Sequence, residues 1–449
     1  MRRTLLRRAA AALLVVLTTA GLPACEGSAT RGSVTVLGPW LDTGPGSEGR
    51  AFKQVLDAFT ADSGIRVNYQ ESRALSQVLL SSAPGGTAPD VAILSTPGDL
   101  ATYARTGKLH PLDGVLDDAQ RTTFRGPWLL PRHDGGREHI YTVPIKANLT
   151  SLVWFNPARG PQPPPRTWEE LVAYSDAAAA RGTTPWCMGM GDAPMSGWPG
   201  IDLIEDIFVH RFGPDLYRRW ARGDLPWTSD QVRQAWMSWG AFATDPRFVR
   251  GGPRTALLTD FEDAGRPLFT DPPGCLLEHQ ASFIMGFYQG KGYRDLRDGG
   301  PRPGVDFDFF PFPPATGKGR VWTVSVDLAG MFNDTPQARA LLRFLATDEA
   351  QRIWPSIPGG AAFTVDEHID PAVYGDDRIS ERIAEVFRST DPLCFHVVDV
   401  LPAAMRTAYY RAVLEYLGNP GQLDQLLRRL DQIRAGIPHE EWLDLPCAR

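Results

Sequence analysis

The sequence predicts an α/β fold with at least two lobes, and two observations support this class. Short β-branched runs alternate with helical patterns along the first hundred residues, a texture typical of parallel β/α units. The chain has 449 residues, and about 425 would follow a cleaved leader, which exceeds one typical domain. Ligands of such sheets bind at the carboxyl ends of the strands.

The first half of the sequence shows this alternation of strands and helices clearly. Apolar residues recur at helical spacing from Phe52 to Phe59, and Gly64 stands where a helix end favours positive φ. Strands are expected over 34–37, 65–69 and 91–94, with a further helix over 75–80.

Helices are more frequent in the second half. Thr167 and Glu170 form a capping-box pattern that predicts a helix from 168 to about 181. Thr335 precedes another helix, and apolar spacing over 423–433 predicts a last amphipathic one. Trp154 and Trp236 lie in apolar context and are expected in the core.

The N-terminus carries an export signal. Four arginines precede an apolar run over 9–17, which is too short to span a bilayer. The sequence Leu-Pro-Ala-Cys at 22–25 then resembles the bacterial lipobox. We expect a signal peptide over 1–24, a lipid on Cys25 and a flexible tether over 25–33; the alternative is an ordinary signal peptide with a coincidental cysteine.

Charge and cysteine content exclude several classes. The whole chain carries 46 basic and 52 acidic side chains, and the leader removes only basic ones, so nucleic acid is not an expected partner. Cys187, Cys275, Cys394 and Cys447 remain after lipidation, which suggests two disulfides in one of three pairings. Their wide spacing does not favour a metal site, and no cofactor is predicted.

Several ordered segments together carry a family resemblance. They are GTAPDVAIL (86–94), VPIKAN (143–148), SLVWFN (151–156), TPWC (184–187), SGWPGID (196–202), PPGC (272–275), DLAGMF (327–332) and FLAT (344–347). In this order the chain resembles the extracellular solute-binding proteins of ABC importers, the group that includes maltose-binding protein. The match is closest to the α-glucoside-binding branch.

The resemblance implies a type II periplasmic-binding fold, with a ligand cleft between two lobes joined by three crossovers. Lobe I would hold 34–142 and 323–354, and lobe II would hold 147–320 and 358–449. The hinge would comprise 143–146, 321–322 and 355–357. The implied protein is a monomer on the outer face of the cell membrane and is anchored only by its lipid. It would pass a sugar to permease subunits.

The resemblance also bears on the cysteines. Cys187 and Cys275 lie inside two matched segments and are expected to pair. Cys394 would then pair with Cys447, both in the C-terminal part of lobe II, and that bond would fasten the chain end.

A sugar site needs apolar rings and polar groups. Trp198, in a Gly-Trp-Pro-Gly turn of a matched segment, is expected to stack on the ligand, and Trp40 follows the first strand at its carboxyl edge. The expected polar contacts lie at strand ends or inside matched segments; they are Asp42, Thr96, Lys146, Asn148, Asp202, Asp327 and Asp399, with Asp99 as a further possibility.

Two departures from the α-glucoside pattern leave other functions open. Asn148 stands where the pattern has an acid, and Val324-Ser325-Val326 replaces a glycine-rich approach to Asp327, which would narrow the cleft. A sensor or partner-binding lipoprotein on the same scaffold is one alternative. A secreted glycoside hydrolase, which needs two facing carboxylates, is the other, although no hydrolase motif is present.

Overall fold

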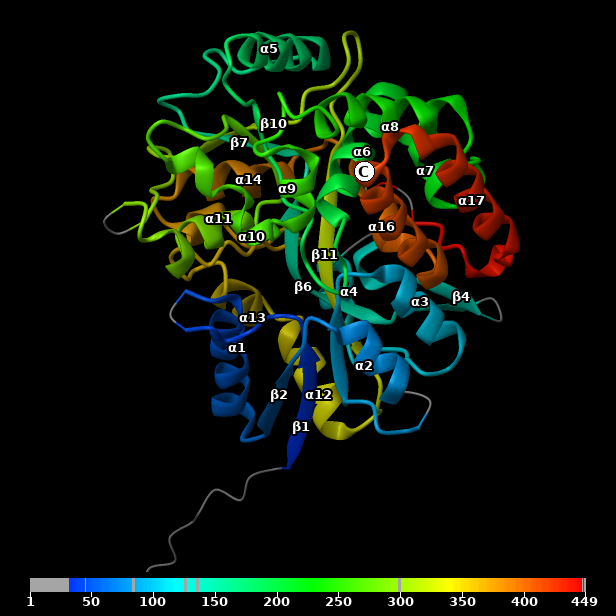
Figure 1. Ribbon diagram of the computed structural model, residues 1–449. Helices are drawn as coiled ribbons and strands as arrows, with labels where there is room; N and C mark the ends of the chain where they lie inside the picture. Colours follow the sequence, from blue (N-terminus) through cyan, green and yellow to red (C-terminus); the bar gives the residue numbers. More distant parts are fainter. Residues whose placement is uncertain are drawn as a thin grey trace, which may run out of the picture.

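Two β-sheets organise the protein, each at the centre of one lobe (Figure 1). The computed structural model describes residues 32–447, apart from 45, 83–84, 125–126, 135–136, 298–299 and 446. The predicted signal peptide, Cys25 and most of the tether lie outside the described residues. None of the helices in the described ranges is long and apolar enough to cross a bilayer.

The first lobe is built on a six-stranded sheet, in the lower half of Figure 1. Its strands are β1 (Ser33–Gly38), β2 (Arg66–Glu71), β3 (Val91–Leu94), β6 (Thr142–Leu149), β11 (Trp322–Met331) and β12 (Leu393–Phe395). Its helices are α1 (Glu48–Ser63), α2 (Leu75–Ser82), α3 (Pro97–Arg105), α4 (Asp118–Thr123), α12 (Pro336–Leu345) and α13 (Asp348–Ile353). A two-stranded ribbon, β4 (Arg132–Asp134) and β5 (Arg137–His139), stands apart from the sheet.

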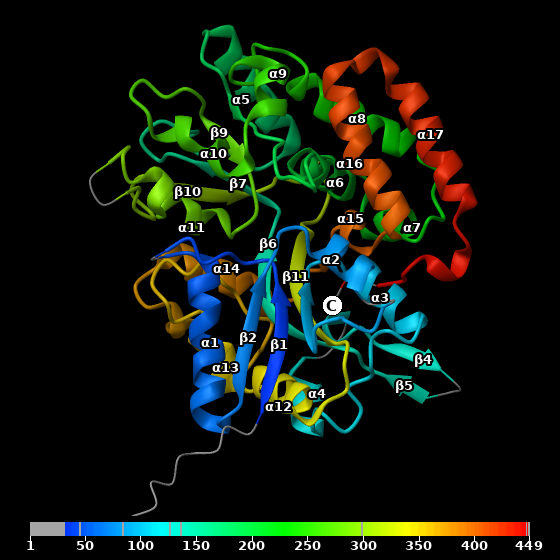
Figure 2. The same ribbon diagram turned by 60° about the horizontal axis from the view of Figure 1, so that its bottom comes forward.

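The second lobe is built on a four-stranded sheet and is richer in helix (Figures 1 and 2). Its strands are β7 (Leu152–Phe155), β8 (Trp186–Cys187), β9 (Leu277–His279) and β10 (Asp308–Pro311). Its helices are α5 (Trp168–Ala180), α6 (Trp198–Phe212), α7 (Pro214–Ala221), α8 (Asp230–Ala243), α9 (Gly252–Leu258), α10 (Phe261–Ala264), α11 (Ile284–Tyr288), α16 (Ala403–Gly418) and α17 (Leu423–Gly436). Two short helices flank β12 in the sequence, α14 (Arg378–Arg388) and α15 (Val397–Val400).

The larger sheet is mixed rather than wholly parallel. β1 pairs in parallel with both β2 and β3, as the alternation of strands and helices predicts. β11, however, runs antiparallel to β3 and β6. The reason is that β11 enters this sheet from the second lobe instead of following a crossover helix within the first.

Two crossings between the sheets lie side by side and are tied together. The chain passes from β6 to β7 through Thr150 and Ser151, and it returns into β11 near Thr323. The Thr323 hydroxyl bonds those of Thr150 and Ser151, at 2.8 and 2.6 Å, and Asp206 of α6 accepts from Ser151 and Thr323. Buried polar groups are thus paired where the lobes join.

The predicted bounds of the lobes and the hinge stay a prediction. Residues 143–146 lie inside β6, and the change of sheet falls three residues or more further on. Within the range predicted for lobe II, β12 pairs with the start of β11 and so extends the sheet of the first lobe.

Local predictions from apolar spacing are confirmed. The face of α1 with Phe52 and Phe59 is buried, and Gly64 ends this helix at φ 70°. Trp154 and Trp236 are fully buried. At the start of α5, the Thr167 side chain accepts from the Glu170 backbone as expected, but the Glu170 carboxylate accepts from the Arg166 backbone N–H and not from Thr167.

Both disulfides form as predicted. Cys187 bonds Cys275, and Cys394 bonds Cys447. The first bond joins β8 to the segment before β9 in the core of the second lobe. The second holds the end of the described chain against β12.

Candidate functional site

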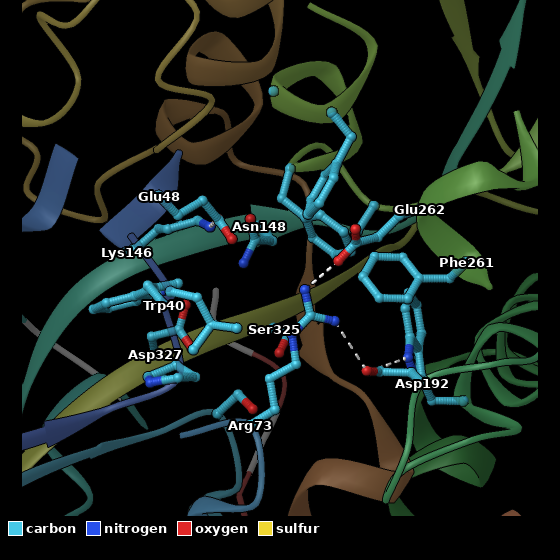
Figure 3. Close-up of a pocket in the computed structure, with 18 of the residues that line it drawn as sticks. Trp40, Glu48, Arg73, Lys146, Asn148, Asp192, Phe261, Glu262, Ser325 and Asp327 are labelled. Atoms are coloured by element: carbon cyan, nitrogen blue, oxygen red, sulfur yellow. Dashed lines mark hydrogen bonds and ion pairs between the residues drawn. The ribbon is translucent and has the colours of Figure 1, made fainter. Parts of the chain in front are cut away.

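A cavity of about 580 Å³ lies between the two lobes. Its volume falls in the range of roughly 300–1,000 Å³ that small-molecule sites occupy. The first lobe contributes side chains from the ends of β1 and β2 and from β6 and β11, and the second contributes side chains from α6 and α10 (Figure 3). This is the position that the fold class predicts for a ligand.

Seven of the nine predicted binding residues line this cavity. They are Trp40, Lys146, Asn148, Trp198, Asp202, Asp327 and Asp399. They come from both lobes, so the fold brings together residues up to 359 positions apart, from Trp40 to Asp399.

Asp42 and Thr96 stand outside the cavity wall, and the structure gives them other partners. Asp42 binds the Arg50 guanidinium through both oxygens at 3.2 Å, and this bond lowers the pKa of Asp42. Thr96 donates to Asp99 at 3.0 Å. Asp99 in turn binds Arg406 of α16 at 2.5 Å, so it links the lobes and does not face the cavity.

Hydrogen-bond acceptors without donors cover part of the wall. Asn148 Oδ1 and Asp399 Oδ2 are buried and have no hydrogen-bond partner among the residues that the structure describes. Burial raises the pKa of Asp202 to about 8, that of Asp327 to about 7 and that of Asp399 to about 6. Removing a carboxylate from water disfavours its charged form. The unpaired oxygens of Asn148 and Asp399 are the atoms that favour a ligand that donates hydrogen bonds.

A charged histidine lies beneath this wall. Burial disfavours the charged form of His396, but Asp202 and Glu205 outweigh that effect and raise the pKa of His396 to about 10. Its Nδ1 lies 2.8 Å from Glu205 Oε2 and its Nε2 lies 2.6 Å from Thr150 Oγ1. Glu205 also accepts the backbone N–H groups of Val397 and Val398, so the histidine is firmly oriented.

Lys146 places a second buried cation at the cavity. Its ammonium binds Glu48 at the start of α1, and it also lowers the pKa of Asp327 against the effect of burial. The ring centroids of three aromatic side chains lie within 6 Å of its Nζ, a distance typical of cation–π contacts. They are Trp354 at 5.3 Å, Phe283 at 5.8 Å and Trp40 at 5.9 Å.

Aromatic rings form the apolar part of the wall. Trp198 is the first residue of α6, and its indole N–H donates to Asp192 Oδ2 at 2.9 Å. Its ring meets Phe261 of α10 edge-on, with centroids 5.2 Å apart, and lies 5.9 Å from Phe283. The indole nitrogen is therefore already occupied, and the ring face is the part that Trp198 offers to a ligand.

The departure at Val324-Ser325-Val326 does not narrow the cavity through the valines. Side chains alternate along β11, and both valines are fully buried, away from the cavity. The residues of β11 that face the cavity are Ser325 and Asp327. The expected narrowing is therefore limited to the small Ser325 side chain.

Sequence reasoning missed several wall residues. Arg73 lies two residues after the end of β2, and the carboxyl-edge argument used for Trp40 would have selected it. Phe261 and Glu262 belong to a four-residue helix with no sequence pattern of its own. His396 follows a three-residue strand, which is too short to be recognised from its sequence.

The fold and the interlobe cavity define a receptor for small solutes. The sequence profile of the bacterial extracellular solute-binding proteins matches residues 43–352, and the chain belongs to this family. The family consists of extracellular receptors and not of enzymes, which confirms the predicted class.

Relatives along nearly the whole chain support this assignment. The osmoprotective compounds-binding protein GgtB of Synechocystis is 34% identical, over 90% of this chain and 93% of its own. The alpha-glucosides-binding periplasmic protein AglE of Rhizobium meliloti is 31% identical, over 87% of this chain and 85% of its own. The solved structure of the bacterial solute receptor AcbH shares the fold with a TM-score of 0.71 at 19% identity, over 89% and 98% of the two chains.

Proposed function

We propose that the protein captures an uncharged, hydroxyl-rich carbohydrate, with an α-glucoside disaccharide as the first candidate. The observation that carries this proposal is the pairing of two walls in one cavity. Trp198, Phe261 and Phe283 present apolar rings, and another part of the wall, with Asn148 and Asp399, presents acceptors that no donor of the described residues reaches. Sugars combine apolar CH faces with hydroxyls that donate, so they match both walls.

The named ligands of the relatives support the same class. AglE is named for alpha-glucosides and GgtB for osmoprotective compounds, and both align with almost the whole chain.

Each predicted residue receives a role in this proposal. The Trp198 ring stacks on a CH face of the sugar, and Asp202, Asp327 and Asp399 accept from hydroxyls. Asn148 adds its free Oδ1 as an acceptor. Lys146 donates to a ring or glycosidic oxygen, and Trp40 helps to hold the lysine in place.

Binding closes the cleft, because the sugar contacts both lobes only when they approach. A ligand shifts a hinge equilibrium only by its preference for the closed state. The closed, monomeric receptor then delivers the sugar to the permease of an ABC importer. It does so from the outer face of the membrane, where a lipid on Cys25 anchors it.

Calorimetry on the purified protein tests the ligand class. Maltose, trehalose and sucrose are titrated beside galactose, glutamate and glycine betaine. We expect an α-glucoside to bind, and we expect Trp198→Ala to weaken it roughly thirtyfold, because losing the apolar contact removes about 2 kcal/mol.

Trp442→Ala is the matched control, since Trp442 lies outside the cavity wall and packs near Gly223. Its sugar affinity should equal that of the unchanged protein. Binding of glutamate or glycine betaine alone would contradict the carbohydrate proposal. Sugar binding that Trp198→Ala leaves unchanged would contradict the stacking role.

A further inference from the structure

Arg73 bridges the two lobes at the rim of the cavity. It lies two residues after the end of β2 in the first lobe. Its Nη1 lies 3.4 Å from Asp192 Oδ1, and its Nη2 donates to Glu262 Oε1. Both carboxylates belong to the second lobe, so these ion pairs exist only while the lobes are close together (Figure 3).

The same carboxylate that binds Arg73 also holds the Trp198 ring. Asp192 Oδ2 accepts from the Trp198 indole N–H at 2.9 Å, while Asp192 Oδ1 faces Arg73. The Arg73 guanidinium also lies 5.9 Å from the Phe261 ring centroid, and Phe261 meets the Trp198 ring edge-on. Arg73 is therefore connected to Trp198 through two intermediate residues, Asp192 and Phe261.

We propose that Arg73 is a positioning residue for ligand binding: it stabilises the closed cleft and, through Asp192, fixes the orientation of the Trp198 ring. The identity of the stacking ligand rests on the proposed function; the effect on closure does not. Closing the lobes brings the arginine to Asp192, and Asp192 then has both oxygens bound. The ring consequently becomes rigid at the moment when a ligand is enclosed.

The Arg73 contact has properties that an incidental ion pair on the surface lacks. A guanidinium presents several donors in a fixed plane and can bind two carboxylates at once. Asp192 is largely buried, with 8% of its surface exposed. A largely buried partner is poorly screened by salt, and leaving it unpaired is costly, so the contact can bias a hinge equilibrium.

The first experiment uses the ligand-free protein. Spin labels are placed at Leu80→Cys on α2 and Leu258→Cys on α9, both strongly exposed and one in each lobe, in the full chain carrying Cys25→Ser. Distances between the labels are measured by double electron–electron resonance. We expect Arg73→Gln to shift the population to longer distances and Arg73→Lys to restore most of the short-distance population.

Arg247→Gln is the matched control, because Arg247 forms a comparable fork with Asp245 inside the second lobe. It should leave the distances unchanged. Identical distributions for Arg73→Gln and the unchanged protein would overturn the closure proposal, whether or not any sugar binds.

The second experiment measures sugar binding, with maltose as the first probe and trehalose and sucrose as the others. We expect Arg73→Gln to weaken binding about tenfold, chiefly through faster dissociation. Arg73→Lys should stay within about threefold of the unchanged protein, because it keeps one ion pair.

Trp198→Phe separates positioning from simple closure. This change keeps a ring but removes the N–H that Asp192 accepts. If Arg73 acts through Asp192 on the ring, Arg73→Gln should cost clearly less affinity in the Trp198→Phe protein than in the unchanged one. Strictly additive effects would overturn the positioning role. Failure of all three sugars to bind would instead contradict the proposed function, and the label distances would still decide the role of Arg73 in closure.

Discussion

Replacing Asp202 by Asn should stabilise the ligand-free protein, and increasingly so as the pH rises. Asp202 lies in the cavity wall with 7% of its surface exposed. Its cationic neighbour is His396, whose Nδ1 lies 3.8 Å from Asp202 Oδ1. Burial raises the pKa of Asp202 to about 8, and Glu205 and Asp399 add to this effect while His396 opposes it.

The magnitude follows from proton linkage. In the unfolded chain Asp202 ionises near pH 4, whereas in the folded protein it keeps its proton up to about pH 8. Between these values the unfolded state binds fewer protons, so the free energy of unfolding falls as the pH rises. The slope is about 1.4 kcal/mol per pH unit, which amounts to about 4 kcal/mol at pH 7.

Asparagine has no proton to lose and therefore removes this fall. The free energy of unfolding, measured by urea denaturation without ligand, should be equal for the two proteins near pH 4. Above that, Asp202→Asn should become progressively more stable up to about pH 8. Asp327 and Asp399 titrate in both proteins, so their effects largely cancel in the difference, and His396 keeps its Glu205 partner in both.

Asp245→Asn is the control of opposite sign, because Arg247 lowers the pKa of Asp245. Its loss should reduce stability slightly at neutral pH; this difference should shrink as the pH falls below the pKa of the unfolded aspartate and vanish only below the lowered pKa of the folded one. A difference between Asp202→Asn and the unchanged protein that stays constant from pH 4 to pH 8 would refute the reasoning about Asp202.

Three further predictions concern other parts of the chain. Cys25→Ser should release the protein into the medium, and unchanged membrane retention would contradict the lipid anchor. Cys447→Ser should lower the free energy of unfolding by about 4 kcal/mol, because it opens a 53-residue loop; urea curves that coincide with those of the unchanged protein would contradict this. Gly98→Ala should cost about 1–3 kcal/mol, because its Cβ would lie 2.5 Å from the Leu401 carbonyl oxygen, and an unaltered melting temperature would disprove that contact.

Local patterns predicted the elements well. The spacing of Phe52 and Phe59 indicates a buried helix face, and Gly64 marks its end, because both signals depend only on neighbouring residues. The carboxyl-edge argument also selected Trp40, which lines the cavity. The same strand logic would have resolved Val324 and Val326, since alternation along β11 turns them away from Ser325 and Asp327.

The rim of the cavity could not be predicted in this way. Arg73 is 119 residues from Asp192 and 189 residues from Glu262, and no local signal connects positions that far apart. The lobes must first fold and meet before these charges are neighbours. For the same reason Asp99 looked like a candidate for the cavity, although it pairs with Arg406 from α16.

The distribution of charge around the cavity also argues for the kind of ligand it accepts. Aromatic rings beside carboxylates are the usual site for a cationic ligand, and this cavity contains such an arrangement around Trp40 and Phe283. Here, however, the Lys146 ammonium already occupies that position and binds Glu48. A cationic solute would meet the charge of Lys146 and, deeper in the wall, that of His396. A neutral solute meets no such repulsion, and its hydroxyls can donate to Asn148, Asp202 and Asp399. We therefore infer that neutral, hydroxyl-rich ligands are favoured over cationic ones because the protein supplies its own cation.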